Sequence, residues 1–259
     1  MKARLLRLVP LALLILVAGV TCAMASHAPD RLVLSDAFLP PSFARPLGCG
    51  EAGVDLTSLL GSAILRGALL AVIVALVGFA IGTPLGAAAA MARGRLERVV
   101  ERACDLVQAF PTFLLAFAVL SAVHAPNRMH LGLVFALTAW APFARLALAQ
   151  TRVLRDAAFV EAAYALGLGR TTVLFRHVVP NLLGVVAVQL GGTAAAVVVS
   201  EAALSFLGFG PRDGVSLGSV MDQGVASMLR APHVLVAGSL SVFCTSAAML
   251  VAGRAASRD

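Results

Sequence analysis

The sequence predicts an all-α polytopic membrane protein with six transmembrane helices and a charged two-helix loop between the fourth and the fifth. Of its 259 residues, 60% are apolar and 13% are charged, whereas a soluble domain has roughly 25% charged residues. Six apolar runs each approach the roughly twenty residues that a hydrocarbon core requires. They lie at about residues 5–24, 65–91, 106–123, 131–149, 182–204 and 234–253. Because backbone groups in a bilayer must bond within their own segment, these runs predict helices.

The first part of the chain, residues 1–61, combines one apolar run with a short segment that we expect on the outer side of the membrane. The run 5–24 follows three basic residues and ends in Ala-Met-Ala at 23–25, which resembles a signal-peptidase site. A cleaved signal and a retained first helix are both open, and we favour a retained helix that acts as a signal anchor. Residues 26–61 are rich in Pro and Gly and are too few to form a domain.

The remainder, residues 62–259, forms the transmembrane domain with five helices. The run 65–91 carries three glycines at four-residue spacing, which share one helical face: Gly78, Gly82 and Gly86. Small residues on one face allow close approach of a neighbouring helix, so we expect a packing role. Pro84 predicts a kink in the same run. Residues 93–105 are a charged connector, and residues 208–231 are a turn-rich linker.

Basic residues give the orientation. With the N-terminus inside, fourteen of the 20 Lys and Arg residues fall on cytoplasmic segments and six on outer segments. The positive-inside rule favours this direction. Both chain ends are then cytoplasmic if the first helix is retained, and the loop at about 150–181 is cytoplasmic too.

This loop is the most informative segment, because it contains EAAYALGLGRTTVLFRHVVP at residues 161–180. Its charges exclude it from the bilayer centre, where each Arg costs about 2.5–3.5 kcal/mol. An apolar helical face recurs at Phe159, Val160, Ala163 and Leu166. Gly167 predicts a helix stop with a bend, and a second short helix ends at Pro180. Its apolar positions need cover, which predicts a partner protein, although a bare interfacial loop also fits the periodicity.

Several classes of chemistry are excluded by what is missing. The single lysine is Lys2, so the chain has no Walker A phosphate loop and no interior lysine for a Schiff base. The four cysteines and five histidines have no metal-ligand spacing, and we expect no bound metal or cofactor. A disulfide between Cys22 and Cys49 is an alternative to the simpler interpretation that both are unpaired. The sequence has no basic stripe interleaved with aromatic residues, so it does not predict nucleic-acid binding.

Two polar residues stand out within the apolar runs. Gln189 and Glu201 both fall in the run 182–204. Polar groups inside a membrane segment are functional candidates by default, so both are candidates for lining a transport pathway. Glu201 lies close to the interface, and a solvated or structurally paired carboxylate is the alternative.

The loop closely resembles the EAA loop of bacterial ABC-importer permeases. Residues that match this motif are Glu161, Ala162, Ala163, Gly167 and Pro180. Val179 replaces the usual Leu, and His177 at the usual Ile position is typical of the peptide-importer branch. Further matches extend over about residues 47–231: GTPLG at 82–86, Asp105 with Phe110-Pro111, Trp140 with Ala144-Arg145, and EAALSFLGFG at 201–210. The chain resembles the C-type permease subunit of the dipeptide, oligopeptide and nickel importers.

This resemblance implies a function and a set of partners. It implies an inner-membrane permease that forms a pathway for a peptide or similar small solute. The implied partners are a second permease subunit, most simply a heterodimer, two ABC ATPases that use ATP, and a periplasmic solute-binding protein. The residues expected at the ATPase contact are Phe159, Glu161, Ala162, Ala163, Leu166, Gly167 and Pro180. The outer segments 47–59 and 215–218 depart from the family pattern, and the solute stays open.

Two rival classes of protein make different predictions. A self-sufficient secondary transporter or channel predicts inverted repeats and transport by this chain alone, and no convincing repeat is present. An intramembrane enzyme would need a nucleophile–base or metal set in the helices, and none is evident.

Overall fold

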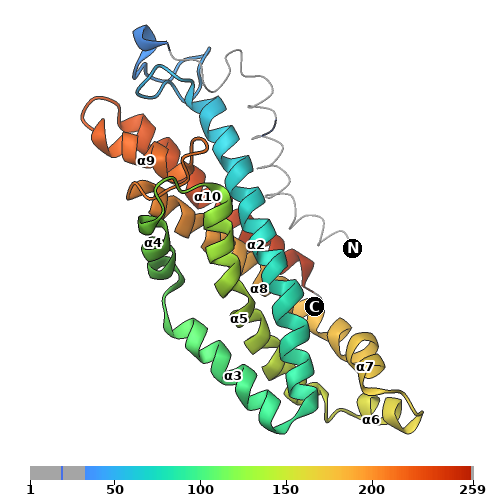
Figure 1. Cartoon of the computed structure of the whole chain (residues 1–259). Helices are drawn as coiled ribbons and strands as arrows, with labels where there is room; N and C mark the ends of the chain where they lie inside the picture. Colours follow the sequence, from blue (N-terminus) through green and yellow to red (C-terminus); the bar gives the residue numbers. More distant parts are fainter. Residues whose placement is uncertain (1–18, 20–32, 258–259) are drawn as a thin grey trace.

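The computed structural model describes residue 19 and residues 33–257 (Figure 1). The predicted first helix at 5–24, the signal-like site and Cys22 lie outside the described residues. In the described part of the chain the secondary structure is helical, apart from an isolated bridge between Cys49 and Asp55.

The helices follow the chain in this order: η1 (Leu34–Asp36), α2 (Leu56–Ala92), α3 (Gly94–Ala109), α4 (Thr112–Ala122), α5 (Arg128–Leu154), α6 (Ala158–Ala165), α7 (Arg170–Val173), the π-helical turn η2 (Leu174–Val178), α8 (Val179–Phe206), α9 (Leu217–Ala226) and α10 (Pro232–Ala256). Four continuous helical segments in this part of the chain are long and apolar enough to cross a membrane: α2, α5, residues 170–206 and α10. The pair α3–α4, bent by 66°, makes a fifth span if it is counted as one. An all-helical membrane protein is therefore confirmed, with four to five spans in the described residues.

The long helices run between two ends of the molecule (Figure 1). One end holds the segment before α2, together with α9 and the start of α5. The other end holds the start of α3 and the hairpin of α6 and α7. The segment before α2 is folded back on itself: Arg45 donates to Asp36 at 2.7 Å and to the Cys49 sulfur at 2.7 Å. These contacts raise the pKa of Arg45. Cys49 is buried and is not in a disulfide with any described cysteine.

Glycines bring the long helices into close backbone contact in pairs. A Cβ added at Gly82 would lie 2.2 Å from the Trp140 carbonyl oxygen, and one at Gly86 would lie 2.0 Å from that of Ala144. The predicted packing face of α2 therefore contacts the α5 backbone directly, while the helix continues through Pro84. Gly191 of α8 meets Gly253 of α10 in the same way, with 2.7 Å from the added Cβ to the Gly253 Cα.

The predicted helix at 106–123 is wrong in its boundaries. Residues 106–109 belong to α3, which also includes most of the predicted charged connector. Phe110 is extended, with φ −93° and ψ 122°, and Pro111 precedes α4. The reason is steric, since a proline ring disfavours helical backbone in the residue before it. The linker at 208–231 is also partly helical, because Ser216 and Ser219 form a capping box that starts α9.

The prediction that Pro180 ends a short helix is also wrong. The helix continues from α7 through η2 into α8, and Pro180 lies in the first turn of α8. Just before it, the Val179 N–H donates to the Leu174 carbonyl, five residues back. This wider turn gives room where a proline ring would otherwise meet the carbonyl four residues earlier. The second element of the loop is therefore the end of a membrane-spanning helix.

Candidate functional site

The hairpin of α6 and α7, residues 157–173, is the candidate coupling site. Its turn is a Schellman motif: the Leu168 N–H donates to the Ala163 carbonyl at 3.2 Å, and the Gly167 N–H donates to the Tyr164 carbonyl at 2.9 Å. Gly167 has φ +79°, a conformation that costs a side chain roughly 1–2 kcal/mol. A Cβ there would meet nothing within 4 Å. The glycine is therefore needed for the bend itself and not for packing within the chain.

One face of the hairpin is anchored in the chain. Val160 is 1% exposed and Ala163 is 4% exposed, and both belong to a core cluster with Val173 and Val178. The same cluster includes Phe143 of α5 and Leu182 of α8. The predicted apolar face is thus divided, since half of it is the anchor of the hairpin.

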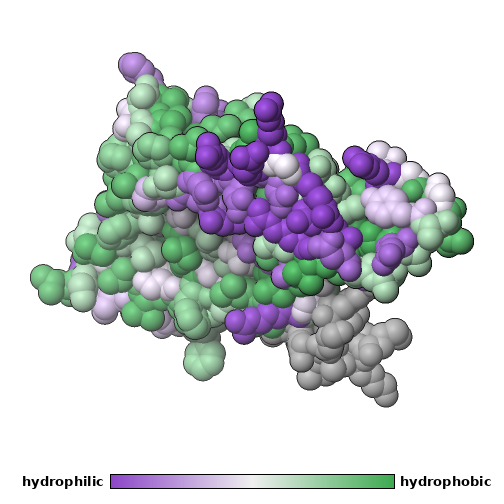
Figure 2. Space-filling view, turned by 90° about the horizontal axis from the view of Figure 1, so that it is seen from below, coloured by the Kyte–Doolittle hydropathy of each residue, from purple (hydrophilic) through white to green (hydrophobic). Residues whose placement is uncertain are grey.

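The other face is exposed. Leu166 is 82% exposed, Phe159 is 40% exposed, and Glu161, Ala162 and Gly167 are also exposed. Seen from this end of the molecule, hydrophilic residues form a band, and a lobe of mixed character lies to its right, on the side where Figure 1 places α6 and α7 (Figure 2). The structure therefore brings five of the predicted contact residues together at one surface. Ala163 lies beneath them, and Pro180 lies beyond the turn η2.

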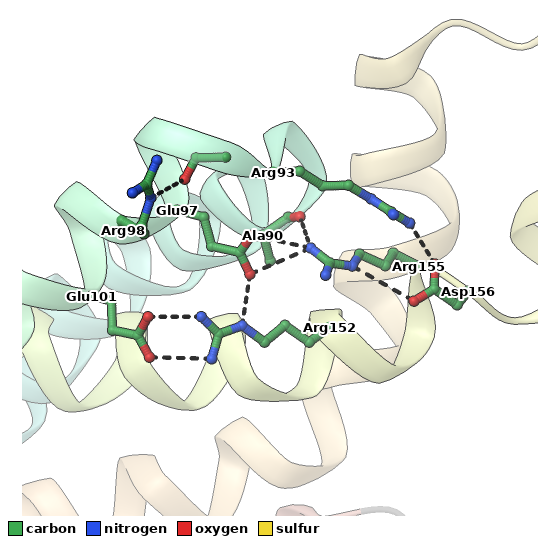
Figure 3. Close-up of polar contacts among 9 residues, drawn as sticks. Ala90, Arg93, Glu97, Arg98, Glu101, Arg152, Arg155 and Asp156 are labelled. Carbon is green, nitrogen blue, oxygen red and sulfur yellow. Dashed lines mark hydrogen bonds and ion pairs between the residues drawn. The ribbon is translucent and has the colours of Figure 1, made fainter.

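An ionic cluster holds the base of the hairpin (Figure 3). Arg152 of α5 pairs with both carboxylate oxygens of Glu101 at 2.8 and 3.2 Å, and donates to Glu97 at 2.6 Å. Arg155 donates to Glu97 at 3.3 Å and to the Ala90 carbonyl of α2 at 2.6 Å. The cluster thus joins α2, α3 and α5, and its residue Arg155 lies three positions before the start of α6. Bidentate, charge-assisted pairs of this kind fix orientation as well as adding energy.

A second contact of the cluster reaches the linker into α6. Arg93, between α2 and α3, pairs with Asp156. Sequence reasoning used Arg93, Arg152 and Arg155 only as markers of orientation and missed their partners. One signal was present: Glu97 and Glu101 are four residues apart, which places both carboxylates on one face of a helix.

The two pathway candidates are not brought together. Gln189 is half-buried and lines a cavity of about 340 Å³ between α3, α4, α5 and α8. Glu201, 3% exposed, does not line this cavity and faces α2, where a Cβ on Gly67 would lie 2.9 Å from its Oε2. Twelve residues of helix separate them, about 18 Å along the axis.

A bundle of membrane spans around a polar-lined cavity, with an exposed helical hairpin at one end, is the architecture expected of the membrane-embedded subunit of a transporter. Comparison with known proteins specifies the class further. Residues 82–254 match the family described as "Binding-protein-dependent transport system inner membrane component". The chain belongs to this family.

Individual relatives agree with the family match. The chain is similar to the glutathione transport system permease protein GsiD of Pectobacterium atrosepticum, with 33% identity over 216 residues that cover 82% of this chain and 71% of the relative. It is similar to the protein of the same name from Shigella dysenteriae serotype 1, with 35% identity over 216 residues that cover 82% and 70%.

The chain is therefore an inner-membrane, multi-pass permease subunit of a binding-protein-dependent ABC importer. It works in a complex with ATPases, a solute-binding protein and another permease, and the ATPase activity belongs to the partner subunits. No cofactor is expected for a permease subunit of this family. The alternative of a self-sufficient secondary transporter or channel is ruled out by this membership.

Proposed function

We propose that the α6–α7 hairpin is the surface through which an ATPase subunit drives this permease, and that the solute is a peptide or a similar small molecule. The solute class is supported by the relatives whose names specify glutathione, a peptide-like molecule. The coupling role is supported by one observation above all: the hairpin is anchored on one face and exposes Phe159, Leu166 and Glu161 on the other.

The exposed face has the chemistry of a helix that docks in a groove. Phe159 and Leu166 provide apolar side chains to bury, and the small Ala162 between them permits close approach of the partner. Glu161 offers a charge at the first turn of α6, where it also complements the helix dipole. Ala163 and Pro180 act indirectly: Ala163 holds the hairpin on the core, and Pro180 lies where the loop joins the span.

Movement of the hairpin would pass into the membrane part by two routes. One is direct, because α7 and α8 form one continuous helix of residues 170–206. The other is the ionic cluster, which joins the hairpin base to α2 and α3. A push on the hairpin therefore reaches helices on two sides of the cavity, as rocking between outward- and inward-facing states requires.

The same proposal includes an arrangement for the complex. Two ATPases would bind a pair of permeases, with this chain and a different permease as a heterodimer. The hairpin end would face the cytoplasm together with both chain ends. The chain would have six transmembrane helices and divide into residues 1–61, which hold the first helix, and 62–259, which form the permease domain. The basic residues counted above support this direction.

The test compares two matched glycines. Gly167 and Gly208 both end a helix in a Schellman motif, with φ of +79° and +83°, and an added Cβ meets nothing within 4 Å at either one. The substitution Gly167→Val strains the hairpin, whereas Gly208→Val applies the same strain at the opposite end of the molecule. Each variant is expressed with its permease, ATPase and binding-protein partners, and co-purification of the ATPases is measured together with ATP-driven uptake of glutathione and dipeptides into proteoliposomes.

We expect Gly167→Val to reduce both ATPase co-purification and uptake at least tenfold, with the permease pair still in the membrane. Gly208→Val should keep its ATPases. Wild-type ATPase binding and uptake by Gly167→Val would refute the coupling role of the hairpin.

A further inference from the structure

We propose that the cavity between α3, α4, α5 and α8 binds an uncharged, amide-bearing part of the solute, and that Gly192 leaves the room for it. This inference rests on the proposed function, since it assigns a site to the peptide-like solute. The cavity has a volume of about 340 Å³, within the range of roughly 300–1,000 Å³ that is typical of small-molecule sites.

The lining is polar but uncharged. Six of its side chains carry hydroxyl or amide groups: Gln108, Thr112, Thr138, Gln189, Thr193 and Ser200. No lining residue is acidic, basic or a histidine. Such a surface can exchange hydrogen bonds with a neutral amide, whereas a charged group would find no counter-charge there and would have a desolvation cost. The chemistry therefore favours the peptide bonds of a solute over its charged ends.

Most of this hydrogen-bonding capacity is unused within the described part of the chain. Thr138 donates to the Phe135 carbonyl at 3.1 Å, and Gln189 donates to Thr193 at 3.2 Å. The second amide N–H and the carbonyl oxygen of Gln189 remain, and no described residue accepts from or donates to the side chains of Gln108 and Ser200. Lipid tails could not satisfy these groups, and unsatisfied polar groups are costly in a hydrocarbon environment.

The adjacent glycines Gly191 and Gly192 have different surroundings: Gly191 packs against α10, and Gly192 lines the cavity. A glycine inside a helix costs about 1 kcal/mol relative to alanine, so each one needs a reason. Gly191 has one in the chain, since it contacts Gly253 of α10. Gly192 has none: an added Cβ would meet nothing within 4 Å, and the residue lines the cavity. The space at Gly192 is therefore kept for something outside this chain.

A solute explains this space better than a helix of the second permease. A packed helix would bury the six polar groups, and each one left without a partner costs about 1–3 kcal/mol. A peptide bond supplies both a donor and an acceptor for these groups.

The decisive variant is Gly192→Leu, which fills the cavity with a good helix former. Its control is Val199→Leu, which adds bulk on the same helix at a position that is 50% exposed and does not line the cavity. A second comparison, Gly191→Leu, places the side chain against α10 and should destabilise the permease. The measurements on the complete complex are the initial rate of dipeptide uptake into proteoliposomes, subunit co-purification and ATP hydrolysis stimulated by the binding protein.

We expect Gly192→Leu to lower uptake at least tenfold, with subunit composition and stimulated ATP hydrolysis within twofold of wild type. Val199→Leu should behave as wild type. Unchanged uptake by Gly192→Leu would overturn the inference, and so would loss of the second permease from the complex, because the cavity would then be a subunit interface.

A second variant tests the chemistry of the site. Gln189→Leu removes the amide with little change in volume, and we expect the KM for dipeptide uptake to rise about threefold to tenfold while the complex assembles normally. An unchanged KM would contradict the amide-binding role. Failure of the proposed function has a different signature: the wild-type complex itself would not take up peptides.

Discussion

Two Glu-Ala-Ala triplets, at residues 161–163 and 201–203, begin segments with the same local ending and opposite surroundings. The C-cap residue of each helix is a leucine, Leu166 or Leu207, followed by a left-handed glycine, Gly167 or Gly208. The closing hydrogen bonds also correspond, from Leu168 to Ala163 and from Phe209 to Leu204. Glu161 is exposed, however, whereas Glu201 is 3% exposed.

The difference shows that the local sequence determines how a helix ends, whereas it does not determine which parts of the protein surround that helix. The first triplet lies on a short hairpin at the end of the molecule, where only Ala163 reaches the core. The second lies in a long helix enclosed by α2, α9 and α10, where Glu201 and Ala202 are both buried. Only the first triplet presents a surface that a partner can reach.

The largest change in the free energy of unfolding is expected for Glu201→Lys compared with Glu161→Lys. A longer cation at 201 would be confined against Gly67 in a closed space, which we expect to cost about 3 kcal/mol or more. The same change at the exposed residue 161 should stay within about 0.5 kcal/mol. Thermal unfolding of the purified complex checks both values, and equal destabilisation would show that the two sites are not as different as their burial indicates.

A smaller change in the free energy of unfolding is expected for the ionic cluster at the base of the α6–α7 hairpin, which carries the first triplet. Arg152→Ala removes the contacts to Glu97 and Glu101, and we expect a loss of about 1–2 kcal/mol together with weaker coupling of ATP hydrolysis to uptake. The control is Arg98→Ala, because Arg98 is exposed and the one hydrogen bond of its side chain among the described residues goes to the Gly94 carbonyl of its own helix. If Arg98→Ala were equally harmful, general charge and not the ionic cluster would be responsible.

The smallest effect on stability is expected from the matched helix ends. Leu166→Ser and Leu207→Ser each change an exposed residue, so both should unfold within about 0.5 kcal/mol of wild type. They should differ in assembly: losing a buried leucine from an interface costs about 1.5–3 kcal/mol, or roughly tenfold or more in affinity. ATPase co-purification should therefore fall for Leu166→Ser alone, and an equal fall for Leu207→Ser would contradict the assignment of the docking face.

The membrane part could be predicted from the sequence because its signals are local. The apolar runs correspond to α2, α5, α8 and α10, and the spacing of Gly78, Gly82 and Gly86 predicted the packed face of α2. The bend at Gly167 followed from glycine chemistry alone. The predicted helix at 106–123 was misplaced because it runs across Phe110-Pro111, and a proline disfavours helical backbone in the residue before it.

The rest depends on contacts between distant residues. Arg152 meets Glu101 across 51 positions, and Arg155 meets Ala90 across 65 positions. Periodicity indicated one apolar face on the hairpin, but it could not show that Val160 and Ala163 turn inward while Leu166 stays outside. In the same way, Gln189 and Glu201 were both polar residues in an apolar run, and only the neighbouring helices decide which one faces the cavity.

The glycine contacts have a mechanical consequence. Where Gly82 and Gly86 touch α5 and Gly191 touches Gly253 of α10, not even a methyl group fits. Neither helix pair can slide or separate at these points without losing these backbone contacts. The cavity lies between α5 of one tightly joined pair and α8 of the other. We therefore expect α2 to move with α5, and α8 to move with α10, when the subunit changes between its outward- and inward-facing states.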